Sequence, residues 1–362
     1  MIIQNRQVMK KLLVAVCAIA ALGLGSCGDD KPTDPQRPSG EGVYAPEAKI
    51  ETVLEDNVPT EVWLWSDETG RLEAIGDPVE CGSYEERIRF SYDGDRVSKV
   101  SMLADSLEMR VGYVGKYISS LTMMYGDVTG ATVAVTHNDA NKVSHLDVDL
   151  DESMISQLLQ QYLSDSSLFA KHPVSRLVGE PAARSLMKVM LMHRPSARKM
   201  TVQDVLIGID FEWSGDNVAR AIASIELTVG VTMAEVGEVV DLESMLGSLA
   251  PLVMALPGEH PLTASIIDTL EFSYDNHPNP LQGFLGAVDV AILSANNQTG
   301  TSNYGTMGLT LTVTVPMIGE YPLSQSIPIS RFSQTQYTYN EKGYPQTLTG
   351  DDGVVKEYQY KE

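Results

Sequence analysis

The sequence lacks the residues that several protein classes require. Its 362 residues include only 3 cysteines, only 7% are aromatic, and 26 Lys and Arg stand against 48 Asp and Glu, a formal net charge of −22. Because phosphate binding needs a basic surface, this charge excludes nucleic acid as an expected partner. No H-E-x-x-H spacing, P-loop, dinucleotide fingerprint or G-x-S-x-G elbow occurs. Motifs therefore give no support for an enzyme or for a bound cofactor.

What is present at the N-terminus resembles a bacterial lipoprotein signal. Three basic residues precede an uncharged run, 12–24, which is shorter than the roughly 20 residues of a membrane-spanning helix. The run ends in Leu24-Gly25-Ser26-Cys27, which resembles a lipobox. The resemblance implies that residues 1–26 are removed and that the lipid on Cys27 attaches the protein to the membrane. An ordinary signal peptide with an incidental cysteine is the alternative.

The segment after the lipobox is polar and acidic. Gly28-Asp29-Asp30-Lys31 resembles the surface-export signal of Bacteroidetes lipoproteins, which predicts an outer-membrane protein facing the cell exterior. The periplasmic face is the alternative. Residues 27–47 offer little to bury and are expected to be a flexible tether before a single β-rich domain, 48–362. Only Cys81 then remains as a thiol, so no intramolecular disulfide is expected.

Alternating runs joined by turn residues repeat along the body. In the run 87–100, Asp93-Gly94 supplies the positive φ of a tight hairpin. Similar patterns occur at 132–149, 210–218, 270–276 and 336–344, and further strands are expected at 222–234, 287–294, 309–315 and 354–360. The sequence therefore predicts a mainly β protein, with an antiparallel up-and-down sheet of more than ten strands. Because large twisted sheets seldom stay flat, we expect it to curl into a partly closed barrel.

Helical patterns interrupt this alternation. Apolar residues recur at helical spacing in 152–163 and again in 181–193, where proline stands at the start. We therefore expect a helical insertion near 152–195 that plugs or covers one barrel end. A third helix is expected at 241–255, broken around Pro251.

Several of these motifs together resemble one family. They are the repeated Tyr-Asp/Asn hairpins, Asn279-Pro280-Leu281 after Tyr274-Asp275-Asn276, and the closing Tyr358-Gln359-Tyr360-Lys361-Glu362. Over roughly residues 48–362 the chain resembles a Bacteroidetes lipoprotein domain family of unknown function with a porin-like fold. The resemblance implies an antiparallel, partly closed barrel and carries no catalytic residues. The helical insertion departs from the family pattern and puts full closure in doubt.

Two tryptophans form the first candidate site. Trp63 and Trp65 flank Leu64, so both rings project from the same face of a strand. If exposed, they would form a stacking platform for a sugar, with Asp67 as an acceptor for sugar hydroxyls. If buried, they are a pair in the hydrophobic core.

Three aspartates form the second candidate site. Asp147, Asp149 and Asp151 alternate along one strand face, and a hard cation such as Ca²⁺ would relieve their repulsion. The glycine-containing loop that wraps ligands around Ca²⁺ is missing, so a solvated strand edge is the alternative.

Three classes of function fit the predicted location and the predicted fold. The first is a surface-exposed binding or accessory lipoprotein for a glycan, a peptide or a partner protein. The second is a structural or envelope-assembly lipoprotein. The third is a secreted hydrolase, which a deep pocket with convergent carboxylates would favour. Sequence alone does not choose among them.

Overall fold

The computed structural model describes residues 44, 46–79, 82–103, 107–151, 202–233, 250–285, 290–315, 319–351 and 353–361. These residues form seventeen strands and two short helices, α7 (Ala250–Met254) and the 3₁₀ helix η5 (Val290–Leu293). The strands are β1 (Ile50–Glu55), β2 (Val58–Trp65), β3 (Leu72–Pro78), β4 (Tyr84–Asp93), β5 (Arg96–Met102), β6 (Leu107–Val114), β7 (Tyr117–Tyr125), β8 (Val128–His137), β9 (Val143–Leu150), β10 (Val202–Ser214), β11 (Asn217–Thr232), β12 (Glu259–Pro278), β13 (Asn296–Val315), β14 (Gly319–Gln334), β15 (Gln336–Tyr339), β16 (Pro345–Thr349) and β17 (Val355–Tyr360).

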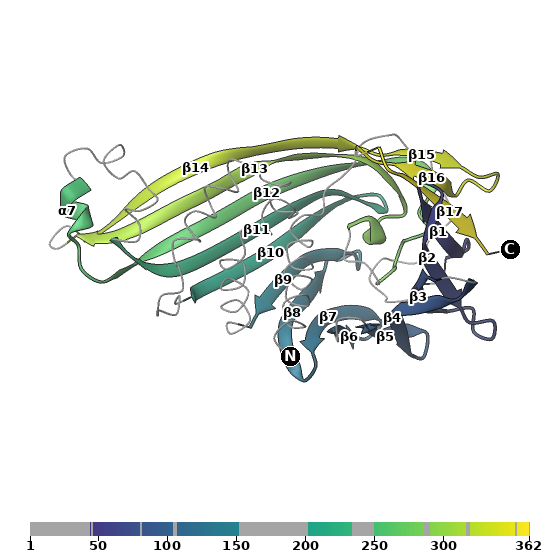
Figure 1. Cartoon of the computed structure of the whole chain (residues 1–362). Helices are drawn as coiled ribbons and strands as arrows, with labels where there is room; N and C mark the ends of the chain where they lie inside the picture. Colours follow the sequence, from purple (N-terminus) through teal and green to yellow (C-terminus); the bar gives the residue numbers. More distant parts are fainter. Residues whose placement is uncertain are drawn as a thin grey trace.

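All seventeen strands belong to one antiparallel up-and-down sheet, which confirms the predicted fold class. Each strand from β1 to β13 pairs with the next along the chain. The path continues from β1 through β17 and β16 to β15. Its two ends, β14 and β15, are separated in the chain only by Thr335, and no ladder joins them among the described pairings. The sheet curls strongly (Figure 1), and no ladder among the described strands closes it.

The predicted hairpin turns are confirmed at four places. Gly94 and Gly215 have positive φ in the β4–β5 and β10–β11 turns, and Asn141 and Gly343 do so in the β8–β9 and β15–β16 turns. One predicted turn and one predicted strand are wrong. The pattern at 270–276 contains no turn, because β12 runs unbroken to Pro278. The strand expected at 287–294 is replaced, in its described part, by η5.

Side chains alternate between two faces of the long strands β10–β14. We call the face that carries the buried apolar residues the inner face, and the opposite face the outer face. Leu311 and Val313 are buried on the inner face of β13, while Thr310 and Thr314 lie on its outer face. These strands extend well beyond the shorter β1–β9 as a curved sheet (Figure 1). The outer face is rich in hydroxyl groups, and pairs such as Thr228 and Thr263 hydrogen-bond across strands (2.9 Å).

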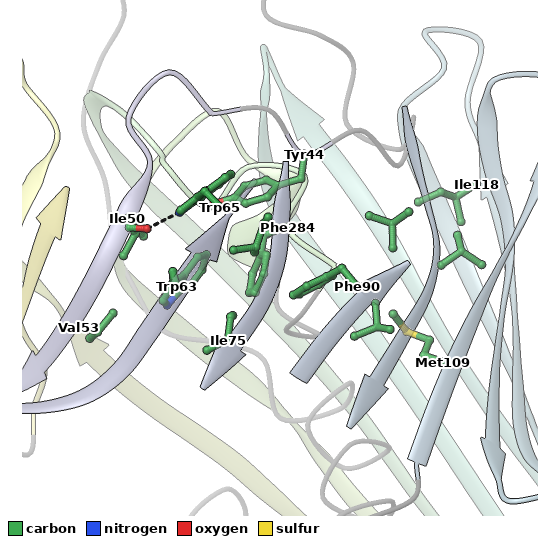
Figure 2. Packing of buried hydrophobic residues seen from close by; sticks show 14 residues of the cluster. Tyr44, Ile50, Val53, Trp63, Trp65, Ile75, Phe90, Met109, Ile118 and Phe284 are labelled. Carbon is green, nitrogen blue, oxygen red and sulfur yellow. Dashed lines mark hydrogen bonds between the residues drawn. The ribbon is translucent and has the colours of Figure 1, made fainter. Parts of the chain in front are cut away.

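The connection between β12 and β13 fills the interior beside the short strands. Its Phe284 is 5% exposed and packs against Tyr44, Trp63 and Phe90, with ring centroids 5.3, 4.8 and 5.8 Å away (Figure 2). The connection is closed by a hydrogen bond from the Gly283 amide to the Ile292 carbonyl (2.7 Å). The predicted helical insertion, 152–195, lies outside the described residues.

Tyr44, which lies in the segment 27–47 expected to be a tether, packs into the folded body. Tyr44 is 4% exposed, and its hydroxyl donates to the carbonyl of Pro280 (2.9 Å). Burial raises its pKa well above the usual value for tyrosine. The folded body therefore includes Tyr44, four residues before the domain start expected at 48, because its ring and hydroxyl both have buried partners.

The helix expected at 241–255 is described only in part. Pro251 is the second residue of α7 and does not break it, since an amide in the first turn has no intrahelical partner to lose. Residues 234–249 lie outside the described residues. None of the helices in the described part of the chain is long and apolar enough to cross a membrane.

The strand β14 has one ladder partner, β13, among the described strands. The Gln334 amide donates to Asp351 Oδ1 (3.1 Å), so even-numbered amides of β14 point away from β13. Pro322 and Pro328 occupy two of these even positions and have no N–H to offer. Proline at an edge is a known protection against strand pairing between molecules.

Restoring both amides should promote self-association. In Pro322→Thr/Pro328→Thr, threonine suits the exposed outer face, and the edge gains two donors. We expect a larger oligomeric fraction than in the wild type across a concentration series in analytical ultracentrifugation. The control Ser326→Thr adds no donor and should match the wild type. Identical sedimentation of the double variant and the wild type would contradict a protective role for the prolines.

Candidate functional site

Three large apolar side chains are exposed together on the outer face of β12–β14. Ile267, Tyr304 and Phe332 are 53%, 44% and 57% exposed. Tyr304 pairs with Ser330, and Phe332 pairs with Ser302, so the two rings occupy one diagonal of a four-residue square. The two serine hydroxyls occupy the other diagonal. Diagonal neighbours on one sheet face lie about 7 Å apart, within reach of one small ligand.

A polar network runs across the sheet up to the Tyr304 ring. The Tyr304 hydroxyl donates to Glu271 Oε1 (2.8 Å), which also accepts from Arg220 Nη2 (3.0 Å). Arg220 Nη1 donates to Glu212 Oε2 (3.0 Å). The network crosses from β10 through β11 and β12 to β13, and it holds the Tyr304 ring by its hydroxyl. We call Ile267, Tyr304, Phe332, Arg220 and Glu271 the outer-face site.

The charges of this network are fixed near neutral pH. Hydrogen bonds from Tyr304 and Arg220 lower the pKa of Glu271, and the hydrogen bond to Glu271 raises the pKa of Arg220. The hydrogen bond that the Tyr304 hydroxyl donates to Glu271 raises the pKa of Tyr304. The carboxylate therefore stays ionised and already has two partners. Such a group suits positioning rather than proton donation, which needs a carboxyl with a raised pKa.

The structure buries the two tryptophans of the first candidate site. Trp63 is 5% and Trp65 9% exposed, and the Trp65 Nε1–H donates to the Ile50 carbonyl (2.6 Å; Figure 2). An exposed stacking platform is therefore wrong for this pair, which belongs to the hydrophobic core. The physical reason is that β2 turns this face inward, onto Phe284. Asp67 is exposed and pairs with Lys361 Nζ (2.7 Å), and this hydrogen bond lowers its pKa.

The three aspartates of the second candidate site do not converge. Asp147 and Asp149 project from the exposed face of β9, and Asp151 is exposed just beyond the strand. Across the residues that the structure describes, no group of three His, Cys, Asp or Glu side chains is placed to hold a metal ion. The predicted lipid site, Cys27, and the remaining thiol, Cys81, lie outside the described residues.

Sequence reasoning missed the outer-face site, although part of its signal was present. At the same strand parity, Tyr304 stands between Ser302 and Thr306, and Phe332 stands between Ser330 and Gln334, so each ring interrupts a polar stretch. An aromatic ring at a position that period-2 alternation assigns to solvent is the detectable feature. The partnership of Arg220 with Glu271 was not detectable, since it depends on the register between β11 and β12.

No protein-family model and no curated protein matches the chain. Its function is therefore inferred from the site itself, because a fold alone does not determine an activity.

Proposed function

We propose that this protein is a lipid-anchored binding module of the bacterial outer membrane that captures neutral glycans on its outer-face site. The observation that carries the proposal is the exposed pair Tyr304 and Phe332, set beside serine hydroxyls on one face of the sheet. Sugar rings present apolar C–H faces and hydroxyl groups together. Aromatic rings pack against such faces, and the neighbouring hydroxyls can bond to the sugar.

The charge of the chain favours neutral glycans over acidic ones. The formal net charge is −22, and a field of one sign repels polyanions. Arg220, the cation nearest to the rings in this network, is already bonded to Glu212 and Glu271. Acidic polysaccharides therefore find no free counter-charge in the network, whereas a neutral sugar needs only the rings and hydroxyls.

The proposed placement rests on the N-terminal residues. Leu24-Gly25-Ser26-Cys27 resembles a lipobox, and Gly28-Asp29-Asp30-Lys31 resembles a surface-export signal. A diacylglycerol with a further acyl chain on Cys27 would give stable attachment. An acidic body is repelled by anionic lipid heads, so the lipid would hold the protein while its outer face stays free for ligands.

Replacing either ring should weaken binding to a neutral polysaccharide. We expect Tyr304→Ala and Phe332→Ala each to weaken binding about tenfold, which corresponds to about 1.4 kcal/mol. Tyr304→Phe keeps the ring but loses the bond to Glu271, so it should retain most of the affinity. The measurement is electrophoretic retardation in native gels containing mixed-linkage β-glucan, xyloglucan or galactomannan, with pectin as the acidic comparison.

The matched control is Tyr321→Ala, which removes a tyrosine that is 55% exposed at a β14 position of inner-face parity. It should migrate as the wild type does in every gel. Retardation that is unchanged in both ring variants, or retardation of the wild type by pectin alone, would contradict the proposal. If no polysaccharide retarded the wild type, that result would instead favour an envelope-assembly role for the same apolar patch.

A further inference from the structure

The three exposed apolar side chains of the outer-face site lie on one diagonal across the sheet. On β14, Phe332 lies two residues after Ser330, the partner of Tyr304. On β12, Ile267 lies two residues before Thr269, which is the other partner of Tyr304. Strands β12 and β14 run in the same direction, since both are antiparallel to β13. These opposite steps therefore place Ile267, Tyr304 and Phe332 in a straight line, which we call the apolar track.

The register sets the length of the apolar track. Diagonal neighbours on one sheet face lie about 7–8 Å apart, so the track spans about 15 Å from Ile267 to Phe332. Its three side chains are 53%, 44% and 57% exposed in the order Ile267, Tyr304, Phe332. A single sugar ring is too small to contact both ends of such a line. A ligand that uses the whole track must therefore be a chain of linked sugars.

Hydroxyl groups line both sides of the apolar track. The printed register gives the three side chains five cross-strand partners, all serine or threonine: Ser224 and Thr306 beside Ile267, Thr269 and Ser330 beside Tyr304, and Ser302 beside Phe332. A hydroxyl can both donate and accept a hydrogen bond, and none of these partners carries a charge. The track is thus an apolar line between two rows of neutral hydrogen-bonding groups, which matches a sugar chain that has apolar ring faces and hydroxyl edges.

A carboxylate follows the apolar track on β11. The next position on the same diagonal beyond Ile267 is Glu226, the partner of Ser265, and its side chain is exposed. A carboxylate accepts hydrogen bonds from sugar hydroxyls and repels acidic sugars. This end of the track therefore also favours a neutral chain.

We propose that the apolar track binds an extended, β-1,4-linked glycan backbone lengthwise across β12–β14. The inference rests on the proposed glycan-binding function and specifies the class of glycan. A β-1,4-linked backbone is extended, so its ring faces follow one another along a straight line. An α-1,4-linked glucan coils, so its successive rings turn away from a straight row of contacts. Ile267 is then the third contact of the backbone, after the two aromatic rings.

The test is titration calorimetry of the full mature chain with β-1,4-linked gluco- and manno-oligosaccharides, from the monosaccharide to the hexasaccharide. In the tighter-binding series we expect the hexasaccharide to bind at least tenfold more tightly than the disaccharide, because only the longer chain reaches the whole track. The α-1,4-linked glucohexasaccharide, which is also neutral and has six sugars, should bind at least tenfold more weakly than the β-1,4-linked hexasaccharide. Ile267→Ala should weaken hexasaccharide binding severalfold and leave disaccharide binding unchanged.

The matched control is Leu206→Ala, which removes an apolar side chain that is 56% exposed on the outer face of β10, away from the track. It should bind every oligosaccharide as the wild type does. Equal affinities for the disaccharide and the hexasaccharide, equal affinities for the two linkages, or an unchanged hexasaccharide affinity in Ile267→Ala would each overturn lengthwise binding. In those cases weaker polysaccharide binding by Tyr304→Ala and Phe332→Ala would still support the glycan surface itself. No response to any oligosaccharide or polysaccharide would overturn both proposals.

Discussion

Phe284→Ala is expected to lower the free energy of unfolding by about 3–5 kcal/mol, the range for removing a buried phenylalanine. Its ring is 5% exposed and stands between Tyr44, Trp63 and Phe90. Removal would leave a cavity that the surrounding strands cannot close, because they are tied into one continuous sheet. The loss is a large fraction of the about 5–15 kcal/mol that stabilises most folded proteins.

The matched control is Phe332→Ala, the same substitution at a residue that is 57% exposed. It should change the free energy of unfolding by less than about 1 kcal/mol. Urea unfolding followed by the fluorescence of the buried Trp63 and Trp65 measures both variants. Equal stabilities of the two variants would show that the β12–β13 connection does not hold the interior together.

Asp268→Asn is expected to stabilise the protein above pH 7 by up to about 3 kcal/mol. Burial raises the pKa of Asp268 from 3.8 to about 6, and each pKa unit corresponds to about 1.4 kcal/mol. The folded state therefore binds this proton more tightly than the unfolded chain. In the wild type, the contribution of this group to stability grows as pH falls from about 7 to about 4, and it is lost as pH rises through 6. The variant has no such dependence.

The measurement compares urea unfolding of the wild type and Asp268→Asn from pH 4 to pH 8 in phosphate and acetate buffers without primary amines. The difference between them should be largest at pH 8 and should approach zero near pH 4. Asp147→Asn, at an exposed position, serves as the control and should follow the wild type throughout. A constant difference across the pH range would mean that Asp268 is not perturbed by burial.

The strands and their turns were predictable because their signals are local. Asp93-Gly94 and Gly215 mark turns by chemistry, and the alternation of leucine and valine with threonine on β13 identifies its buried face. At 270–276 the same tyrosine-and-aspartate pattern lies inside the long strand β12. Asp275 there accepts hydrogen bonds from the Asn297 backbone and side chain across the ladder, so a turn-like residue serves as a link between strands.

The sites depended on information that is not local. The period-2 pattern shows that Trp63 and Trp65 share a face, but only the packing of Phe284 shows that this face is inner. Phe284 itself lies in a connection without periodicity, so no sequence pattern indicates its burial. Asp268 and Asn303 come from two strands, and only the register brings their side chains within hydrogen-bonding distance.

Hydroxyl-radical footprinting of the mature protein with and without a retarding neutral polysaccharide tests the glycan-binding role most directly. Mass spectrometry reports the oxidation of each aromatic side chain. We predict that the polysaccharide protects Tyr304 and Phe332, while Tyr321 on the same long strands keeps its rate. Unprotected Tyr304 and Phe332 together with protection at any other aromatic residue would contradict the assignment of the outer-face site.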